Sequence, residues 1–214
     1  MIKGMKNIKS GYERRNEILD TAQEIFLRNG YDNTSVSDVV KAVGIAQGTF
    51  YYYFKSKEEL LTSILERYAE QMSNSVSKIV YSEGMKAGEK ILLIIKEILN
   101  FEKGRENIIE YVHRNENKEM HKKIAEKIIA KMIPLLVEVV EQGNANNEFD
   151  VKYPYELVSI MMPGIGMFIH ESLDEINQKE YYDKKIISLE YVIKRMLSWK
   201  SSEISLLNIK YKVE

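Results

Sequence analysis

Histidines and carboxylates are the residues of this 214-residue chain whose spacing could serve catalysis. Glu110 and His113 have the Glu-x-x-His spacing of half a carboxylate-bridged di-iron site, which needs a second such pair. Neither His121 nor His170 follows an acidic residue by three positions, and no histidine follows His170 at the spacing of a zinc protease. The chain also has no cysteine, Gly-rich phosphate loop or Ser nucleophile elbow. We therefore expect neither an enzyme nor a resident metal or cofactor.

The stretch from Gln47 to Lys57 offers binding chemistry instead. Gln47 and Thr49 can donate hydrogen bonds to the edges of DNA bases and accept them, while tyrosine hydroxyls and lysine ammonium groups suit phosphate oxygens. Gly48 has no side chain, so the backbone can approach a DNA groove closely there. This stretch is a candidate DNA-binding segment.

A run of tyrosines is also typical of a buried aromatic cluster, and helical spacing helps to separate the two interpretations. Phe50 and Phe54 are one turn apart and predict the buried face of a short helix. At ~100° per residue, Tyr51 and Tyr52 are turned about 100° and 200° away from Phe50. Tyr53 lies nearer the buried side and is expected to divide its role.

Helix start and stop signals position this stretch. Capping boxes with Ser-x-x-Glu or Ser-x-x-Asp spacing begin at Ser10, Ser35 and Ser56. The first predicted helix ends at Gly30, the second is short and ends at Gly44, the third covers 47–54, and a long helix follows Ser56. Two short helices joined by a glycine-containing turn, with a polar face on the second, indicate a helix-turn-helix.

The remainder of the chain also predicts helices, near 86–102, 105–115, 118–142, 154–173 and 180–198. Pro134 lies inside an apolar helical pattern, so we expect it to kink that helix without ending it. The signals from Lys200 onward are weak, and this tail is expected to fray. With no extended strand pattern, the chain is predicted to be all-α with about nine helices.

Charge and composition limit the surroundings and partners. Residues 1–57 hold nine Lys and Arg against six acids, a net charge of +3, whereas the remainder has a net charge of −4. This asymmetry fits a DNA-binding N-terminal unit, although chance alone could also produce it. The longest nearly uncharged apolar run, 158–169, is shorter than the roughly 20 residues of a membrane span. The basic start and the absence of cysteine favour a cytoplasmic protein without a membrane partner.

Residues 29–61 closely resemble the DNA-binding signature of the TetR family of bacterial transcriptional regulators, and they read N-G-Y-D-N-T-S-V-S-D-V-V-K-A-V-G-I-A-Q-G-T-F-Y-Y-Y-F-K-S-K-E-E-L-L. The resemblance extends back through the first helix. Beyond it, the chain is similar to the family in length, in helical content and in the loop E-Q-G-N-A-N-N-E-F-D before a helix.

The resemblance implies a homodimer whose two heads bind successive major-groove faces of a pseudo-palindromic operator in double-stranded DNA. Many relatives carry arginine where this chain has Ser37, so a serine–phosphate contact is the alternative to a guanine-reading contact there. Lys3, Lys6 and Lys9 could form an arm along DNA or a solvated leader. The DNA contacts implied by the resemblance are Thr34, Ser35, Ser37, Gln47, Gly48, Thr49, Tyr51, Tyr52, Tyr53 and Lys57.

In TetR-like proteins the second domain dimerises and holds a small-molecule pocket. The segments 154–173 and 181–197 are apolar enough for a four-helix dimer interface, with Gly164 and Gly166 allowing close approach, or for a plain core. Arg114 could meet a ligand carboxylate or lie in solvent beside Glu110 or Glu116. The pocket candidates, each of which also fits a core position, are Phe101, Tyr111, His113, Arg114, Met120, Met132, Met161, Met162, Phe168 and His170.

The sequence therefore predicts a helix-turn-helix DNA-binding domain in residues 1–57 and a ligand-binding and dimerisation domain in residues 58–214. The expected function is that of a dimeric transcriptional regulator, a repressor that an unknown small-molecule effector releases from its operator. The alternative is a helix-turn-helix protein that contacts only other proteins. Lysine and tyrosine on the outer face of the third helix favour DNA.

Overall fold

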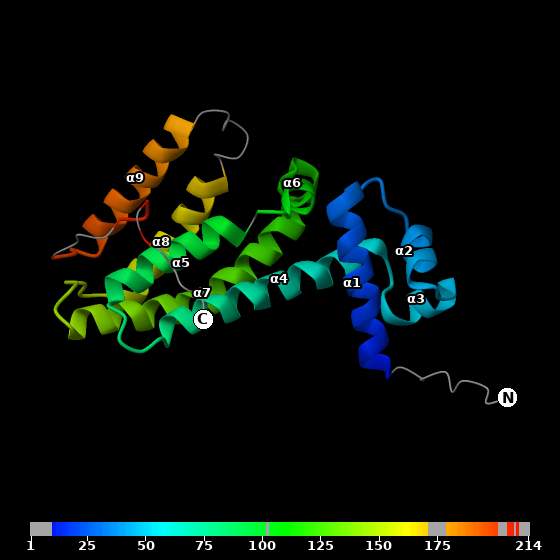
Figure 1. Ribbon diagram of the computed structural model, residues 1–214, viewed down its shortest axis with the longest axis horizontal. Helices are drawn as coiled ribbons and strands as arrows, with labels where there is room; N and C mark the ends of the chain where they lie inside the picture. Colours follow the sequence, from blue (N-terminus) through cyan, green and yellow to red (C-terminus); the bar gives the residue numbers. More distant parts are fainter. Residues whose placement is uncertain (1–9, 102, 171–178, 201–204, 208, 210–214) are drawn as a thin grey trace. The chain divides into compact units, whose positions relative to one another are not determined.

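The computed structural model describes residues 10–101, 103–170, 179–200, 205–207 and 209. Within these residues it contains nine α-helices, one short 3-10 helix and no strand, which confirms the predicted all-α fold (Figure 1). The chain forms two compact units. The head unit consists of residues up to Tyr68 together with Gly104–Ile124, and the body unit consists of Ala69–Lys103 together with residues from Ala125 onward. The predicted functional division after Lys57 stays a prediction.

Local capping begins the first two helices of the head unit. Ser10 precedes α1 (Gly11–Asn29), and its hydroxyl accepts from the Glu13 N–H while the Glu13 carboxylate accepts from the Ser10 N–H. Ser35 and Asp38 form the same reciprocal pair at the start of α2 (Val36–Val43). Both capping boxes are confirmed. Gly44, in the left-handed conformation with φ of 73°, ends α2 as predicted.

The third capping box is formed only in part. The Ser56 hydroxyl accepts from the Glu59 N–H at 3.1 Å at the start of α4 (Lys57–Val80), as the spacing predicts. The Glu59 carboxylate, however, accepts from the N–H of Lys55 at 2.8 Å and not from that of Ser56. The carboxylate therefore ties the residue that leaves α3 (Gln47–Tyr53) to the first turn of α4.

The head unit has its own apolar core. Phe50 of α3 and Phe54 just after it are fully buried, with ring centroids 5.9 Å apart. A sixth helix, α6 (Glu106–His113), belongs to the head unit although it lies far along the chain, and it packs against α1. The other buried residues that fix α1 and the first turns of α4 are Ile18, Leu19, Ala22, Ile25, Phe26, Leu60, Leu61 and Ile64.

The body unit contains α5 (Ala87–Phe101), α8 (Pro154–His170), α9 (Lys179–Met196) and most of α7 (Lys118–Ala145). Helix α7 continues through Pro134, as predicted. The helices of this unit enclose one apolar core that includes Ile91, Met132, Val139, Val158 and Ile193. Among the described residues, no helix combines the length and the apolar character that a membrane crossing requires.

Part of the C-terminal tail packs onto the body unit. The Glu190 carboxylate of α9 accepts from the Ser205 hydroxyl and from the Leu206 N–H, both at 2.8 Å. Lys96 of α5 donates to the Ile209 carbonyl at 2.5 Å, and Leu206 and Ile209 are buried. The tail was expected to fray, but its described residues, 205–207 and 209, are held by α5 and α9. Residues 201–204, 208 and 210–214 lie outside the described part.

Candidate nucleic-acid interface

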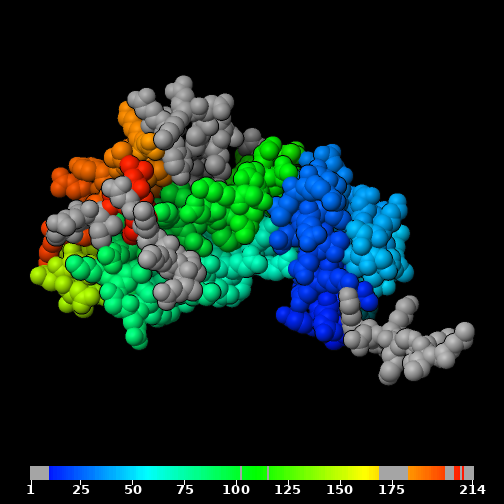
Figure 2. Space-filling model, in the orientation of Figure 1, coloured from blue at the N-terminus to red at the C-terminus, as the bar shows by residue number. Residues whose placement is uncertain are grey.

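Helix α3 presents polar and aromatic side chains on the side opposite its buried phenylalanines. Gln47 and Gly48 are exposed, and Tyr51 and Tyr52 are 49% and 81% exposed. Since Phe50 and Phe54 anchor the helix from beneath, these residues lie on the outer surface of the head unit. Figure 2 shows α2 and α3 in lighter blue at this surface.

Thr49 and Tyr53 are half-buried at the edges of this exposed face. The Tyr53 ring packs edge-on against Tyr52 with centroids 4.9 Å apart. Its hydroxyl lies beside Gly11, where a Cβ would come within 3.7 Å of the oxygen. Tyr53 thus lies between the exposed face of α3 and the first turn of α1.

The start of α2 places two hydroxyls at the same surface. Ser35 and Ser37 are exposed. The Ser35 hydroxyl and backbone N–H both hydrogen-bond to Asp38, and these bonds, led by that of the hydroxyl, hold the pKa of Asp38 below its usual value. Capping fixes the position of Ser35, while Ser37 lies two residues further along, in the first turn of α2.

Two predicted DNA contacts have partners inside the head unit. Thr34 is buried and its hydroxyl donates to the Gly30 carbonyl at 2.9 Å. The Lys57 ammonium donates to the carbonyls of Tyr31 and Thr34 at 3.0 and 2.9 Å and lies 4.0 Å from the centre of the Tyr31 ring. This arrangement does not support DNA contacts by Thr34 and Lys57, because both polar groups are used to hold the turn between α1 and α2.

Helix α6 contacts the same turn from another side. Tyr111 packs on Tyr31 with ring centroids 4.1 Å apart, and Arg114 forms an ion pair with Asp32. Asn107 donates to the Leu27 carbonyl at 2.7 Å. Burial, with the Glu58 carboxylate and the Tyr111 phenol nearby, raises the pKa of Tyr31 well above its usual value. Sequence reasoning missed this contact, since about 80 residues separate its two sides and the spacing within one helix does not show which other segment it meets.

Comparison with known proteins supports the interpretation of this surface. The family profile described as "Bacterial regulatory proteins, tetR family" matches residues 18–64, which run from α1 into α4. The "Fatty acid metabolism regulator protein" of Bacillus subtilis is 28% identical over 148 residues, 66% of this chain and 76% of its own. The "HTH-type transcriptional regulator QacR" of Staphylococcus aureus is 28% identical over 181 residues, 77% of this chain and 89% of its own.

Residues 18–64 of this chain match the DNA-binding domain of the TetR family of bacterial regulatory proteins. Helices α2 and α3 are therefore the helix-turn-helix of a DNA-binding transcriptional regulator. Solved structures agree with this fold. The regulator FadR from Bacillus subtilis in complex with stearoyl-CoA has a TM-score of 0.61 at 25% identity, covering 86% of this chain and 97% of its own. A transcriptional regulator from Cytophaga hutchinsonii has a TM-score of 0.67 at 17% identity, covering 86% and 96%.

The predicted ligand-pocket residues of this chain fall into both units. Met132, Met161 and Met162 lie in the body core, and Phe101 packs against it. Phe168 is partly exposed, with the Lys185 ammonium 4.3 Å from its ring centre. The side chain of His170 lies outside the described part. The remaining candidates belong to the head unit, and these are Tyr111, His113, Arg114 and Met120.

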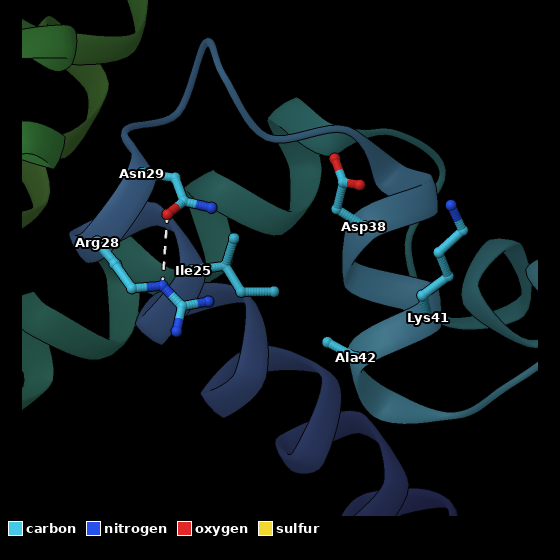
Figure 3. Close-up of a pocket in the computed structure, with 6 residues that line it drawn as sticks. All are labelled: Ile25, Arg28, Asn29, Asp38, Lys41 and Ala42. Carbon is cyan, nitrogen blue, oxygen red and sulfur yellow. Dashed lines mark hydrogen bonds between the residues drawn. The ribbon is translucent and has the colours of Figure 1, made fainter.

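A hollow of about 360 Å³ lies in the head unit between α1 and α2 (Figure 3). Arg28 donates to the Asn29 side chain at 3.3 Å at one side of it, and Asp38 and Lys41 face it from α2. None of the predicted pocket residues lines this hollow.

The histidines do not form a metal centre in the described part of this chain. His113 and His121 have ring centroids 4.8 Å apart. Within the described ranges, however, no three His, Asp or Glu side chains are placed to hold a metal ion.

Proposed function

We propose that this TetR-family regulator is a homodimeric repressor that binds a pseudo-palindromic operator and leaves it when a small molecule binds the body unit. The exposed face of α3 carries the DNA-binding part of the proposal. Phe50 and Phe54 are fully buried, while Tyr52 on the other side is 81% exposed, so the helix is packed from one side only. A helix anchored in this way can enter a major groove.

Each exposed group of the helix-turn-helix has a role in this proposal. Gln47 and Thr49 contact base edges, because amide and hydroxyl groups both donate and accept hydrogen bonds. Tyr51 and Tyr52 contact phosphates beside the groove, and Ser37 does so from α2, whereas the Ser35 hydroxyl already donates to Asp38 and caps the helix. Gly48 leaves room for the backbone to approach, since nothing lies within 4 Å of a Cβ placed there. Tyr53 contributes to the proposed DNA-binding surface only through the exposed part of its side chain.

Exposed apolar faces of α8 and α9 support the proposed dimer. On α8, Ile160 and Met167 are 72% and 67% exposed, and a Cβ at Gly164 would meet nothing within 4 Å. On α9, Ile187, Tyr191 and Val192 are also exposed. Large apolar side chains gathered on one helix face are unusual in a monomer. Two such helices from each protomer would bury these faces in a four-helix interface.

The effector part of the proposal is supported by a relative and by the body core. FadR of Bacillus subtilis was solved with stearoyl-CoA bound. The Met132, Met161 and Met162 side chains provide flexible apolar surface of the kind that adaptable ligand sites use. Stearoyl-CoA is therefore the first probe for release from the operator.

Helix α6 is the proposed link to the DNA-binding surface. Tyr111 and Arg114 hold Tyr31 and Asp32, which lie four and three residues before the cap residue Ser35. A shift of α6 would move this turn and the start of α2 with it. Coupling of about 1–3 kcal/mol would lower operator affinity roughly 5- to 150-fold. Arg114→Met is expected to speed hydrogen exchange at residues 31–35, and unchanged exchange there would argue against this link.

The proposed DNA contacts can be tested with DNA selected by the protein from a random duplex pool. Gln47→Ala is expected to change the preference at particular base pairs. Tyr52→Phe is expected to weaken binding to all sequences. Tyr81→Phe is the matched control, because Tyr81 is an exposed tyrosine of the body unit. A sequence profile unaltered by Gln47→Ala would contradict the assignment of that residue.

The same assay separates DNA binding from the alternative of a helix-turn-helix used only for protein contacts. If the head unit binds DNA, its affinity for DNA falls steeply as the salt concentration rises, and it binds one DNA sequence more tightly than others. Binding without sequence preference or salt dependence would favour the protein-contact alternative. The exposed Tyr52 and Lys55 on the outer face support DNA.

A further inference from the structure

The first turn of α1 carries a tyrosine that packing does not account for. Tyr12 is 77% exposed, second only to Tyr52 among the exposed large apolar side chains of the described residues. Both belong to the head unit. The Tyr12 ring and its hydroxyl are therefore open to solvent at the surface of the head unit, where a binding partner can reach them.

The first turn of α1 lies against the C-terminal end of α3. The Tyr53 hydroxyl would be 3.7 Å from a Cβ placed on Gly11. Arg15, one turn later, has its guanidinium carbon 4.9 Å from the centre of the Phe54 ring and donates to Ser63 of α4 at 3.0 Å. Gly11 and Arg15 therefore mark the side of α1 that meets the exit of α3.

Tyr12 lies at the border of that side. At ~100° per residue, it is turned about 60° around α1 from Arg15. The Tyr52 ring contacts Tyr53, and Tyr53 reaches Gly11, the residue before Tyr12. Tyr52, Tyr53 and Tyr12 thus follow one edge that runs from α3 to the first turn of α1.

The charge along this edge is compatible with phosphate. The only carboxylate in the first turn of α1 is that of Glu13, which is turned back to accept from the Ser10 N–H at 2.7 Å. The exposed Lys55, next to Phe54 in the chain, adds a positive charge at the exit of α3. A tyrosine hydroxyl is a suitable donor to a phosphate oxygen.

We propose that Tyr12 is a further DNA contact, whose hydroxyl donates to a phosphate flanking the groove that α3 enters. This inference rests on the proposed function, because it requires α3 to bind DNA. The DNA-binding surface then extends beyond the helix-turn-helix to α1. Because the contact is to the DNA backbone, it adds affinity and orients the head without reading sequence.

The test compares Tyr12→Phe and Tyr12→Ala with the parent protein on its selected operator and on an unrelated duplex, by fluorescence anisotropy at several salt concentrations. Loss of one hydrogen bond to a phosphate is expected to weaken both complexes by the same factor, about 3- to 10-fold. The slope of log affinity against log salt stays unchanged, because a neutral hydroxyl displaces no counterion. Thermal unfolding is expected to match that of the parent, since Tyr12 is exposed.

Unchanged binding by both Tyr12 variants would overturn the inference. Tyr52→Phe, measured beside them, shows whether the proposed function falls as well. If Tyr52→Phe weakens binding while the Tyr12 variants do not, only the contact by α1 is lost from the proposal. If the Tyr52 variant also binds like the parent, the proposed phosphate contacts of α3 fail with it.

Discussion

Neighbouring lysines of the head unit have different environments, although the sequence presents them as alike. Lys55 is exposed, whereas the Lys57 ammonium donates to two carbonyls and lies over the Tyr31 ring. Nothing in the order K-S-K distinguishes them. The carbonyl acceptors of Lys57 are 26 and 23 residues away, so only the folded turn between α1 and α2 reveals its role.

Replacement of each lysine by methionine is expected to separate these roles. Lys57→Met removes two charge-assisted hydrogen bonds and is expected to lower the free energy of unfolding by about 1–3 kcal/mol. Lys55→Met is expected to leave stability near that of the parent and to weaken DNA binding with a smaller salt slope. Urea unfolding and anisotropy titrations measure the two effects. Equal stability of the two variants would contradict the internal role of Lys57.

The helices themselves were largely predictable, because their signals are local. Ser10 with Glu13 and Ser35 with Asp38 define the starts of α1 and α2 within four residues of sequence. Phe50 and Phe54 define the buried side of α3 by spacing alone. The same helical spacing predicts that Tyr51 and Tyr52 lie on the exposed side of α3.

Contacts between distant helices were not predictable in this way. The α6 contacts of Tyr111 and Arg114 with the turn after α1 join residues about 80 positions apart. The methionines predicted for the pocket carry no signal that distinguishes a ligand wall from a core, and Met132 is simply buried in the body unit. Such assignments depend on which helix faces meet, which spacing along one helix does not give.

Close packing at the start of α5 gives a second prediction. A Cβ on Gly88 would lie 1.9 Å from the Trp199 ring, which itself packs on Phe149. The Glu148 carboxylate holds the Gly88 N–H at 3.1 Å, so the helix start cannot easily move away. Gly88→Ala is therefore expected to lower the free energy of unfolding by about 1–3 kcal/mol.

The matched control for this substitution is Gly48→Ala. Gly48 is also helical, and nothing lies within 4 Å of a Cβ there. Its replacement is expected to leave stability unchanged or to raise it by up to about 1 kcal/mol through helix propensity. Urea unfolding of both variants measures the difference. A Gly88→Ala protein as stable as the control would mean that Trp199 can repack.

The C-terminal tail is held to α9 by a carboxylate, and this gives a pH dependence. Burial alone would raise the pKa of Glu190, but hydrogen bonds from Lys194, the Leu206 N–H and Ser205 outweigh it and bring the pKa below its usual 4.5. The stabilisation is therefore fully present above pH 4.5 and lost as the pH falls through the lowered pKa.

Glu190→Gln is expected to be less stable than the parent at neutral pH, with the difference shrinking as the pH falls below 4.5. Urea unfolding at a series of pH values measures this difference. Glu83→Gln, at an exposed position, controls for the loss of one carboxylate. A difference that stays constant with pH would show that the carboxylate charge does not hold the tail.

Each of the two compact units is built from two separate stretches of the chain. The head unit takes α6 from the second half of the chain, and the body unit receives the end of α4 from the first. The predicted boundary at Lys57 lies four residues after α3, the second helix of the helix-turn-helix, ends. It does not describe which residues stabilise the helix-turn-helix, because Asn107, Tyr111 and Arg114 contribute to that.

The assembly of two chains is tested best at α8. Ile160→Glu places a charge on the exposed apolar face and is expected to convert a dimer into a monomer at micromolar concentration. Tyr81→Glu, at an exposed position of the body unit outside α8 and α9, is the control. Analytical ultracentrifugation measures both. A parent protein that is monomeric at every concentration would rule out the proposed dimer.

The one-sided anchoring of α3 has a practical consequence for engineering. Phe50 and Phe54 can be kept as a constant base while positions 47, 48 and 52 are randomised in a library, because these exposed positions are not part of the head's core. Variants drawn from such a library should differ in the promoter sequences they recognise and retain nearly equal melting temperatures. The same scaffold can then supply a set of mutually independent genetic switches.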